Sequence, residues 1–137
     1  MTRDEKLETV YRLFRWANHV GETGAEMRLE DIEGIFAAHA PMILNGRPIC
    51  HDHASHFRHA QDLRAQMATW RFNIPFERTV VEGDQVVGYY TVDFTDHAGA
   101  RGRFYDLCIF TVRDDRIAGI LETVHFEGEA LDIASFD

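Results

Sequence analysis

The sequence predicts one α+β domain, in which three N-terminal helices pack on a curved, mainly antiparallel β-sheet. Apolar residues recur at helical spacing over roughly the first half of the chain. After about residue 70 the pattern changes to short strand-like runs separated by turn residues. The chain has 137 residues, of which 45% are hydrophobic and 27% charged. That length and balance suit a single globular domain, so we take residues 1–137 as one domain.

Capping patterns and apolar stripes define the first two helices. A Thr-x-x-Glu capping box at residues 2–5 begins the first helix, which we expect to end near Gly21. Its apolar face consists of Leu7, Val10, Phe14 and Ala17. The same capping pattern recurs at residues 23–26, and the second helix is expected to end before Pro41. Its apolar face consists of Leu29, Ile32, Ile35 and Phe36.

The next elements are a short strand pair, a third helix and a meander of strands. Apolar residues flank an Asn45-Gly46 turn signal in "PMILNGRPIC", which predicts the strand pair. Asp52 is placed to cap a third helix that runs to about Thr69. Four strand-like runs follow: "RFNIPFERTVV", "QVVGYYTVDFT", "RGRFYDLCIFTV" and "RIAGILETVHF".

The last two runs can be paired if Asp114-Asp115 is a two-residue turn. Uninterrupted pairing then puts Asp106 opposite Thr123 and Phe104 opposite His125. One predicted face carries Phe104, Asp106, Cys108, Phe110, Leu121, Thr123 and His125. The other carries Tyr105, Leu107, Ile109, Ile120, Glu122 and Val124. Both faces are largely apolar, so we expect one to meet the helices and the other to meet a second copy of the chain in a homodimer.

Composition narrows the partners. The formal net charge is -9, with 23 acidic and 14 basic residues, which disfavours nucleic acid and anionic membrane surfaces. No apolar run approaches the roughly 20 residues of a membrane span, and the charged N-terminus does not resemble a signal peptide. The two cysteines do not suggest a secreted disulfide scaffold. We therefore expect a cytoplasmic protein.

Three segments carry a family resemblance: "LEDIEGIFAAHAPMILNGRPI", "FERTVVEGDQVVGYYTVDFTD" and "GRFYDLCIFTVRDDRIAGILETVHF". In these segments the chain resembles the SnoaL-like branch of the nuclear transport factor 2-like superfamily. That superfamily also contains ketosteroid isomerase, scytalone dehydratase and limonene epoxide hydrolase. The resemblance implies a cone-shaped, cystatin-like α+β roll with a deep pocket between the sheet and the helices, usually as a dimer.

Ketosteroid isomerase residues carry over only in part. Where the resemblance places the general-base aspartate, this sequence has Leu44 and Asn45. The second, proton-donating aspartate matches Cys108, with Asp106 two residues earlier. Tyr11 corresponds to the tyrosine on the first helix of that enzyme. Without the base, the resemblance disfavours ketosteroid isomerase activity.

The third predicted helix contains a histidine cluster, "HDHASHFRHA". On a helical wheel His56 falls within the apolar stripe, and His53 and His59 flank it by about 60° each. These side chains are interpreted as hydrogen-bonded polar groups at the helix edge, as pocket residues, or as metal ligands with a further ligand such as Asp106 or His125. Three imidazoles at three-residue spacing rotate around the helix and do not converge on one ion. We therefore predict neither a metal nor a cofactor.

Asp106 lies inside a strand, on a face that we expect to be buried. Its structural interpretations are an ion pair with Arg103 or a hydrogen bond to Thr123. Its functional interpretation is a carboxyl group whose pKa is raised by burial. The pairing above brings His125 close to it, and His56 faces it from the helix. We therefore predict His56, Asp106 and His125 as the catalytic residues.

These observations favour a cofactor-free acid–base enzyme, an isomerase, cyclase, dehydratase or hydrolase, that acts on a small hydrophobic molecule. One alternative is a non-catalytic ligand-binding or interaction domain with the same cavity. A second is a metal-assisted enzyme that uses the histidine cluster. The predicted pocket is lined by Tyr11, Phe14, His53, Phe57, His59, Phe104, Cys108, Phe110 and Thr123.

Overall fold

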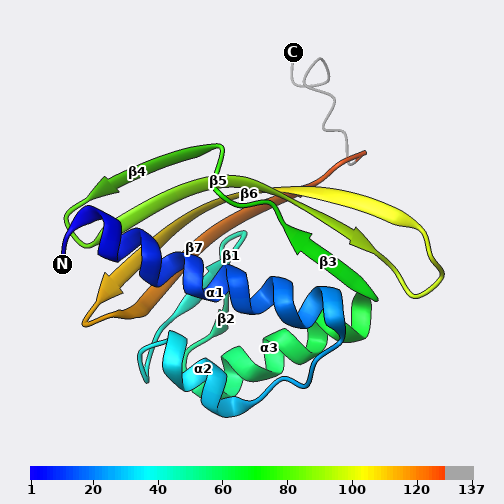
Figure 1. The fold of residues 1–137 in the computed structure, drawn as a ribbon, viewed down its shortest axis with the longest axis horizontal. Helices are drawn as coiled ribbons and strands as arrows, with labels where there is room; N and C mark the ends of the chain where they lie inside the picture. The colour runs from blue at the N-terminus through cyan, green and yellow to red at the C-terminus, as the bar shows by residue number, and fades with distance from the viewer. Residues whose placement is uncertain (129–137) are drawn as a thin grey trace.

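A computed structural model describes residues 1–128 and confirms the α+β class. Within these residues, three helices pack on one side of a curved, seven-stranded sheet (Figure 1). The helices are α1 (Arg3–Thr23), α2 (Leu29–Ile35) and α3 (His53–Gln66). The strands are β1 (Met42–Leu44), β2 (Arg47–Cys50), β3 (Thr69–Phe72), β4 (Arg78–Glu82), β5 (Gln85–Thr95), β6 (Arg101–Arg113) and β7 (Arg116–Phe126). None of the described helices combines the length and the apolar character that crossing a membrane requires.

The ends of α1 follow from its capping residues. The Thr2 side chain accepts a hydrogen bond from the Glu5 backbone N–H at 3.1 Å, as the capping box predicts. At the other end Gly24 adopts a left-handed conformation, φ 71°, and its N–H donates to the carbonyl of Val20. The helix thus continues two residues past the predicted end at Gly21. The second predicted capping pattern at residues 23–26 is wrong, because α2 begins only at Leu29.

The sheet runs in the order β2-β1-β7-β6-β5-β3, and β4 also pairs with β5. The short strands β1 and β2 form the predicted pair around Asn45-Gly46, and β1 lies parallel to β7. All other pairs are antiparallel. The run "RFNIPFERTVV" forms two strands rather than one. Both β3 and β4 pair along the same edge of β5, one after the other.

The hairpin of β6 and β7 contains a β-bulge that changes its register. Asp114 and Asp115 have positive φ angles of 49° and 62° and form the predicted two-residue turn. Val112 pairs with Ile117 as expected, but Thr111 then pairs with Gly119. One extra residue, Ala118, therefore lies in β7 without a pairing partner.

This bulge makes the predicted register wrong for the rest of the hairpin. Asp106 pairs with Val124 instead of Thr123, and Phe104 pairs with Phe126 instead of His125. Since side chains alternate between the two faces of a strand, a shift of one residue exchanges the faces of β7. Glu122 therefore joins Asp106 on the face that meets the helices.

The core centres on α1 and the concave face of the sheet. The buried Phe14 ring lies edge-on to four aromatic rings, those of Phe72, Phe76, Tyr90 and Phe110, with centroids 4.9 to 5.8 Å away. Farther along α1, the indole Nε1 of Trp70 donates a 2.9 Å hydrogen bond to the carbonyl of Ala17. Trp70 lies directly against Gly21, where a Cβ atom would come within 2.5 Å of the indole ring. Gly21 is therefore needed for the close approach of α1 and β3.

We expect Gly21→Ala to lower the free energy of unfolding by about 1 to 2 kcal/mol, because the methyl group overlaps the buried indole. Gly34→Ala is the matched control, since a Cβ there meets no described atom within 4 Å. Helix propensity alone predicts that the control is neutral or stabilises by up to about 1 kcal/mol. Urea denaturation followed by circular dichroism measures both effects. Equal effects of the two substitutions would contradict this account of Gly21.

Candidate functional site

A cavity of about 680 Å³ lies between the concave face of the sheet and the helices. Its walls are mainly apolar and aromatic, with contributions from α1, α3 and strands β5 to β7. Five residues of the predicted lining contact this space: Phe14, His59, Phe104, Cys108 and Phe110. Trp70 contacts it as well. A cavity of this size and character suits a small hydrophobic molecule.

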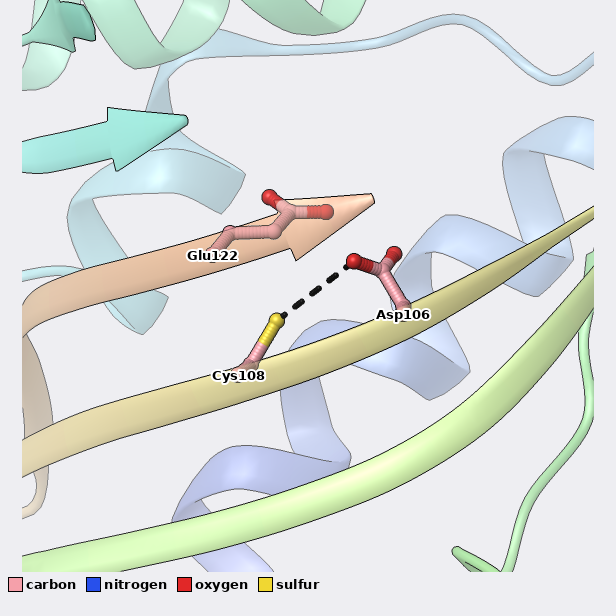
Figure 2. Close-up of side chains that lie close together, drawn as sticks. All are labelled: Asp106, Cys108 and Glu122. Carbon is pink, nitrogen blue, oxygen red and sulfur yellow. Dashed lines mark hydrogen bonds between the residues drawn. The ribbon is translucent and has the colours of Figure 1, made fainter. Parts of the chain in front are cut away.

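Three polar side chains gather on the sheet side of the cavity: Asp106, Cys108 and Glu122 (Figure 2). Asp106 and Cys108 lie two residues apart on β6 and therefore share a face. Glu122 lies directly opposite Cys108 on β7, and Figure 2 shows its carboxyl group extending toward Asp106. One ligand atom from each of the three side chains lies within 4.8 Å of the other two. We call Asp106 and Glu122 the carboxyl pair, and Cys108 places its thiol beside them.

Asp106 is buried, with 1% of its surface exposed. Its Oδ1 accepts a hydrogen bond from the Cys108 thiol at 3.8 Å. Its Oδ2 is also buried and has no hydrogen-bond partner among the described residues. The predicted partners do not pair with it: Arg103 bonds to Asp93, and Thr123 faces the other side of the sheet. A buried carboxyl oxygen without a partner is energetically costly.

The two carboxyl groups of this pair lie too close together to titrate independently. Burial raises the pKa of Glu122 well above its usual value, and the neighbouring Asp106 carboxylate raises it further. Burial also raises the pKa of Asp106, while hydrogen bonds from its neighbours partly oppose this effect. Two carboxyl groups at this separation do not readily ionise together. The pair therefore favours a state that retains at least one proton.

Cys108 and Tyr90 extend this arrangement. The Tyr90 hydroxyl lies 3.2 Å from Sγ of Cys108, whose thiol proton points to Asp106. The tyrosine therefore donates to the sulfur, in a chain that ends at the carboxylate. Burial raises the pKa values of both Tyr90 and Cys108 well above their usual ranges, so both stay protonated. Cys108 is accordingly a hydrogen-bond donor here, and it forms no disulfide with Cys50.

The same three side chains are close enough to offer ligands to one cation. A metal requires deprotonated carboxyl and thiol groups, however, and burial raises the pKa values of Asp106, Cys108 and Glu122. The donor set therefore fits proton transfer better than metal binding.

His56 faces the interior, as its place in the apolar stripe of α3 predicts, and is 3% exposed. Its Nε2 lies 2.7 Å from the carbonyl of Ala40, and its ring stacks on Phe36 at 4.0 Å. Because a carbonyl oxygen only accepts, Nε2 carries the proton. The neighbouring His53 contacts the carbonyl of Phe36 in the same way, at 2.8 Å. These two histidines thus hold the connection between α2 and β1 against α3.

Burial lowers the pKa of His56 below its usual 6.5, although its bond to Ala40 partly opposes this effect. Below about pH 6.5 the unfolded chain therefore gains a proton that the folded chain resists. We expect the stability contributed by neutral His56 to be present above this pH and to fall as the pH drops toward the folded-state pKa. Burial lowers the pKa of His59 as well, with the same sign.

His56→Gln, which keeps a hydrogen-bond donor, should therefore show a smaller loss of stability between pH 7 and pH 5 than the unchanged protein. We expect the difference to be about 1 kcal/mol, measured by urea denaturation at both pH values. His51→Gln is the control, because the His51 side chain is 81% exposed. An unchanged pH dependence in His56→Gln would contradict a buried neutral imidazole.

The structure does not bring the predicted catalytic residues together as a His/Asp/His group. Asp106 and His56 both line the cavity, on the sheet side and the α3 side. His125 does not: it pairs with Tyr105 on the opposite face of the sheet and is exposed. Thr123 lies outside the cavity for the same reason, the extra residue in β7.

Three other residues predicted to line the pocket also lie outside it. The Tyr11 hydroxyl accepts a hydrogen bond from the backbone N–H of Phe76. Tyr11 therefore uses its hydroxyl group for a contact inside the protein. His53 contacts the α2–β1 connection instead, and Phe57 packs partly buried against the edge of the core. The helical wheel identifies an inward face, but it does not distinguish the core from the cavity wall.

Sequence reasoning missed Glu122, which uninterrupted pairing assigned to the wrong face. Gly119 in the middle of the strand was the available signal, because an isolated glycine in a strand often marks a bulge. Tyr89 and Tyr90 are adjacent on β5, so their side chains point to opposite faces of the sheet. The structure turns Tyr90 into the cavity, whereas Tyr89 does not line it.

Comparison with known protein families finds no match, and comparison with curated proteins finds none either. Solved structures do match. A protein assigned as a SnoaL-like polyketide cyclase from Jannaschia sp. CCS1 matches with a TM-score of 0.71 at 16% identity, covering 88% of this chain and 85% of that one. An NTF2-like protein of unknown function from Burkholderia pseudomallei K96243 matches with a TM-score of 0.70 at 15% identity, covering 93% and 92%.

An epoxide hydrolase of the LEH-like type from M. tuberculosis matches with a TM-score of 0.68 at 12% identity, covering 89% of this chain and 84% of that one. At these identities the likeness concerns the fold alone. It confirms the fold that the sequence resemblance implied, a cone-shaped α+β roll shared by SnoaL-like and other NTF2-like proteins.

Proposed function

We propose that this chain, which has the NTF2-like fold, is a cofactor-free acid–base enzyme that acts on a small hydrophobic molecule. The observation that carries the proposal is the carboxyl pair in an apolar cavity, with one buried Asp106 oxygen that no described residue satisfies. Proton transfer by positioned carboxyl groups contributes about 100- to 10,000-fold to a reaction rate. This pair replaces the predicted His/Asp/His group as the proposed catalytic centre.

Two carboxyl groups that share one proton can move a proton between two positions of a bound molecule. The ionised Asp106 takes a proton from the substrate, and the protonated Glu122 supplies one at another atom. The pair then carries the same single proton as before, on the other carboxyl group. The chain from Tyr90 through Cys108 to Asp106 supplies a hydrogen bond that stabilises the ionised form. Isomerisation, cyclisation and dehydration all require such a double transfer.

The fold neighbours support this chemistry without identifying the reaction. Among them are proteins named as a polyketide cyclase and as an epoxide hydrolase. One name is that of a cyclase and the other that of a hydrolase. We therefore place isomerase, cyclase, dehydratase and hydrolase activities within the proposal.

Deuterium exchange tests the proposed function without a known substrate. β-Tetralone, a bicyclic ketone with acidic C–H bonds, is incubated with the protein in deuterated buffer, and its mass is followed over time. We expect exchange well above the buffer rate, and no acceleration after the cavity is filled by a competing aromatic ligand. Exchange at the buffer rate for β-tetralone and for a panel of related bicyclic ketones would leave a ligand-binding domain as the better interpretation.

We also propose that the chain forms a homodimer through the outer face of the sheet. In the part of the chain that the structure describes, the helices lie on one side of the sheet only (Figure 1). The opposite face exposes Leu107 and Leu121, 50% and 48% exposed, beside partly buried Ile109. Contiguous exposed apolar residues of this kind favour association.

Sedimentation velocity tests the dimer. We expect a dimer for the unchanged chain and a shift to monomer for Leu121→Glu, with at least a 100-fold weaker association. Glu33→Gln, an exposed substitution on α2, should leave the dimer unchanged. A monomer at all concentrations of the unchanged chain would overturn this proposal.

A further inference from the structure

His56 has two ring nitrogens, and the protein binds only one of them. Nε2 lies 2.7 Å from the backbone carbonyl of Ala40 and therefore carries the ring proton. Nδ1 then holds a lone pair and is a hydrogen-bond acceptor. Within residues 1–128 this nitrogen has no partner, yet it is not one of the side-chain atoms that are completely buried without one. Nδ1 therefore keeps some accessible surface on a residue that is only 3% exposed.

The surroundings of the ring direct this accessible surface into the cavity. His56 lines the cavity from α3, whereas Asp106 and Glu122 line it from the sheet. One face of the imidazole is covered by the Phe36 ring, at a centroid distance of 4.0 Å and an interplanar angle of 15°. The stack and the bond to Ala40 together fix the orientation of the ring. The α3 wall thus presents a fixed acceptor nitrogen to whatever occupies the cavity.

This acceptor is uncharged near neutral pH. Burial lowers the pKa of His56, and the nearby His59 and His53 lower it further, while the bond to Ala40 and the charge of Asp52 oppose these effects. The ring therefore keeps the lone pair of Nδ1 available near pH 7. A neutral imidazole accepts a hydrogen bond without bringing a charge into an apolar cavity.

From this geometry we infer that His56 is a specificity-determining residue, whose Nδ1 accepts a hydrogen bond from an O–H or N–H group at the end of the bound molecule farther from the carboxyl pair. The inference rests on the proposed function and deepens it, because it names the residue that orients the substrate. One end of the molecule is held on α3, and the other end then lies against the carboxyl pair on the sheet. Such fixed orientation of the reacting groups contributes to catalysis.

Hydroxylated tetralones test this role. The isomers of β-tetralone that carry one hydroxyl group on the aromatic ring place an O–H donor at different positions, and each has a methoxy counterpart that cannot donate. Their binding is measured by isothermal titration calorimetry at pH 7.5. We expect one hydroxy isomer to bind about 5-fold more tightly than its methoxy counterpart, which is the net effect of about one hydrogen bond. Equal affinities within every pair would overturn the inference.

Two substitutions separate recognition by Nδ1 from the structural bond of Nε2. The amide nitrogen of glutamine reaches the position of Nε2, so His56→Gln keeps a donor for the Ala40 carbonyl and loses the Nδ1 acceptor. The amide oxygen of asparagine lies near the position of Nδ1, so His56→Asn keeps an acceptor and loses the bond to Ala40. We expect the preference for the hydroxy isomer to fall to less than about 2-fold in His56→Gln and to persist in His56→Asn. The opposite result would show that His56 acts only through its bond to Ala40 and would overturn the inference.

His53→Gln is the matched control. The Nε2 atom of His53 lies 2.8 Å from the carbonyl of Phe36, in the same connection between α2 and β1, but His53 does not line the cavity. This variant should keep the native preference for the hydroxy isomer. An equal loss of preference in His53→Gln and His56→Gln would show that both act by loosening the connection, and the inference would be wrong.

The inference and the proposed function fail in different measurements, because calorimetry reports binding and deuterium exchange reports turnover. Exchange into β-tetralone with equal binding within every hydroxy–methoxy pair would support the acid–base enzyme and overturn the role of His56. A preference that depends on His56, without exchange into any of these ketones, would support the role of His56 in binding and overturn the proposed catalysis.

Discussion

Asp106→Asn is expected to slow deuterium exchange into β-tetralone by about 1,000-fold, to near the rate in buffer. The amide of asparagine has nearly the same shape as the carboxyl group, but it does not take up a proton near neutral pH. In Asp106→Asn the carboxyl pair therefore loses the group that exchanges the proton-holding role with Glu122. Because Asp106 is buried, the substitution also removes a charge that the apolar cavity disfavours. We therefore expect the loss of exchange without a loss of folded structure, measured by mass spectrometry and circular dichroism.

The pH profile separates proton transfer from a structural effect of this substitution. Exchange by the unchanged protein requires one proton on the pair, so its rate should fall at low pH, where both carboxyls are protonated, and at high pH, where both are ionised. Burial raises the pKa values of Asp106 and Glu122, so the maximum should lie above the range in which ordinary carboxyls titrate. The residual exchange rate of Asp106→Asn should no longer fall as the pH is lowered. A variant with a low rate and an unchanged bell would contradict a direct role for Asp106.

Cys108→Ala is the control for the surroundings of the pair. It removes the thiol that donates to Asp106 but leaves both carboxyl groups in place. We expect exchange to fall by less than 10-fold, with the bell displaced toward higher pH, since the carboxylate loses a hydrogen bond. If Cys108→Ala lost as much of the exchange rate as Asp106→Asn, the Cys108 thiol would be the proton-transfer group instead of the carboxyl pair.

Much of the fold could be predicted because local signals and the tertiary structure agree. Thr2 caps α1, Asp52 caps α3, and the Asp114-Asp115 turn has the backbone that a two-residue hairpin requires. Each signal acts within a few residues, so the sequence displays it directly. The same reasoning identified Asp106, because a carboxyl group in the middle of an apolar strand is visible without knowing its partners.

The partner of Asp106 could not be predicted in the same way. Sequence reasoning assigns each strand residue to one face of the sheet by counting alternate residues along the strand. The bulge at Ala118 inserts one residue, so every later residue of β7 is assigned to the wrong face. The error exchanged Glu122 for Thr123 and His125, and so replaced a carboxyl pair with a His/Asp group. For His56 the inward direction was predictable, but its acceptor, the Ala40 carbonyl, depends on the path of the chain between α2 and β1.

Glu122→Gln is expected to raise the free energy of unfolding at high pH. Burial raises the pKa of Glu122 well above its value in the unfolded chain. A raised pKa means that the folded state holds the proton more tightly, so this contribution to stability is present below the unfolded pKa and is lost as the pH rises through the folded one. Glutamine stays neutral at every pH. The variant should therefore be more stable than the unchanged protein by about 2 to 3 kcal/mol at pH 9, with little difference at pH 4.

Urea denaturation at the two pH values measures this difference, and Glu33→Gln, an exposed glutamate on α2, provides the matched change in charge. The control should differ from the unchanged protein by no more than about 0.5 kcal/mol. The same Glu122→Gln protein should lose most of its deuterium exchange, since it no longer exchanges a proton with the substrate. A gain in stability coupled to a loss of proton transfer is what a functional, buried carboxyl pair requires, because a side chain retained only for packing would be destabilised by the substitution. An equal or lower stability of Glu122→Gln at pH 9 would show that the ionised glutamate is satisfied in the folded state and that the pair is structural.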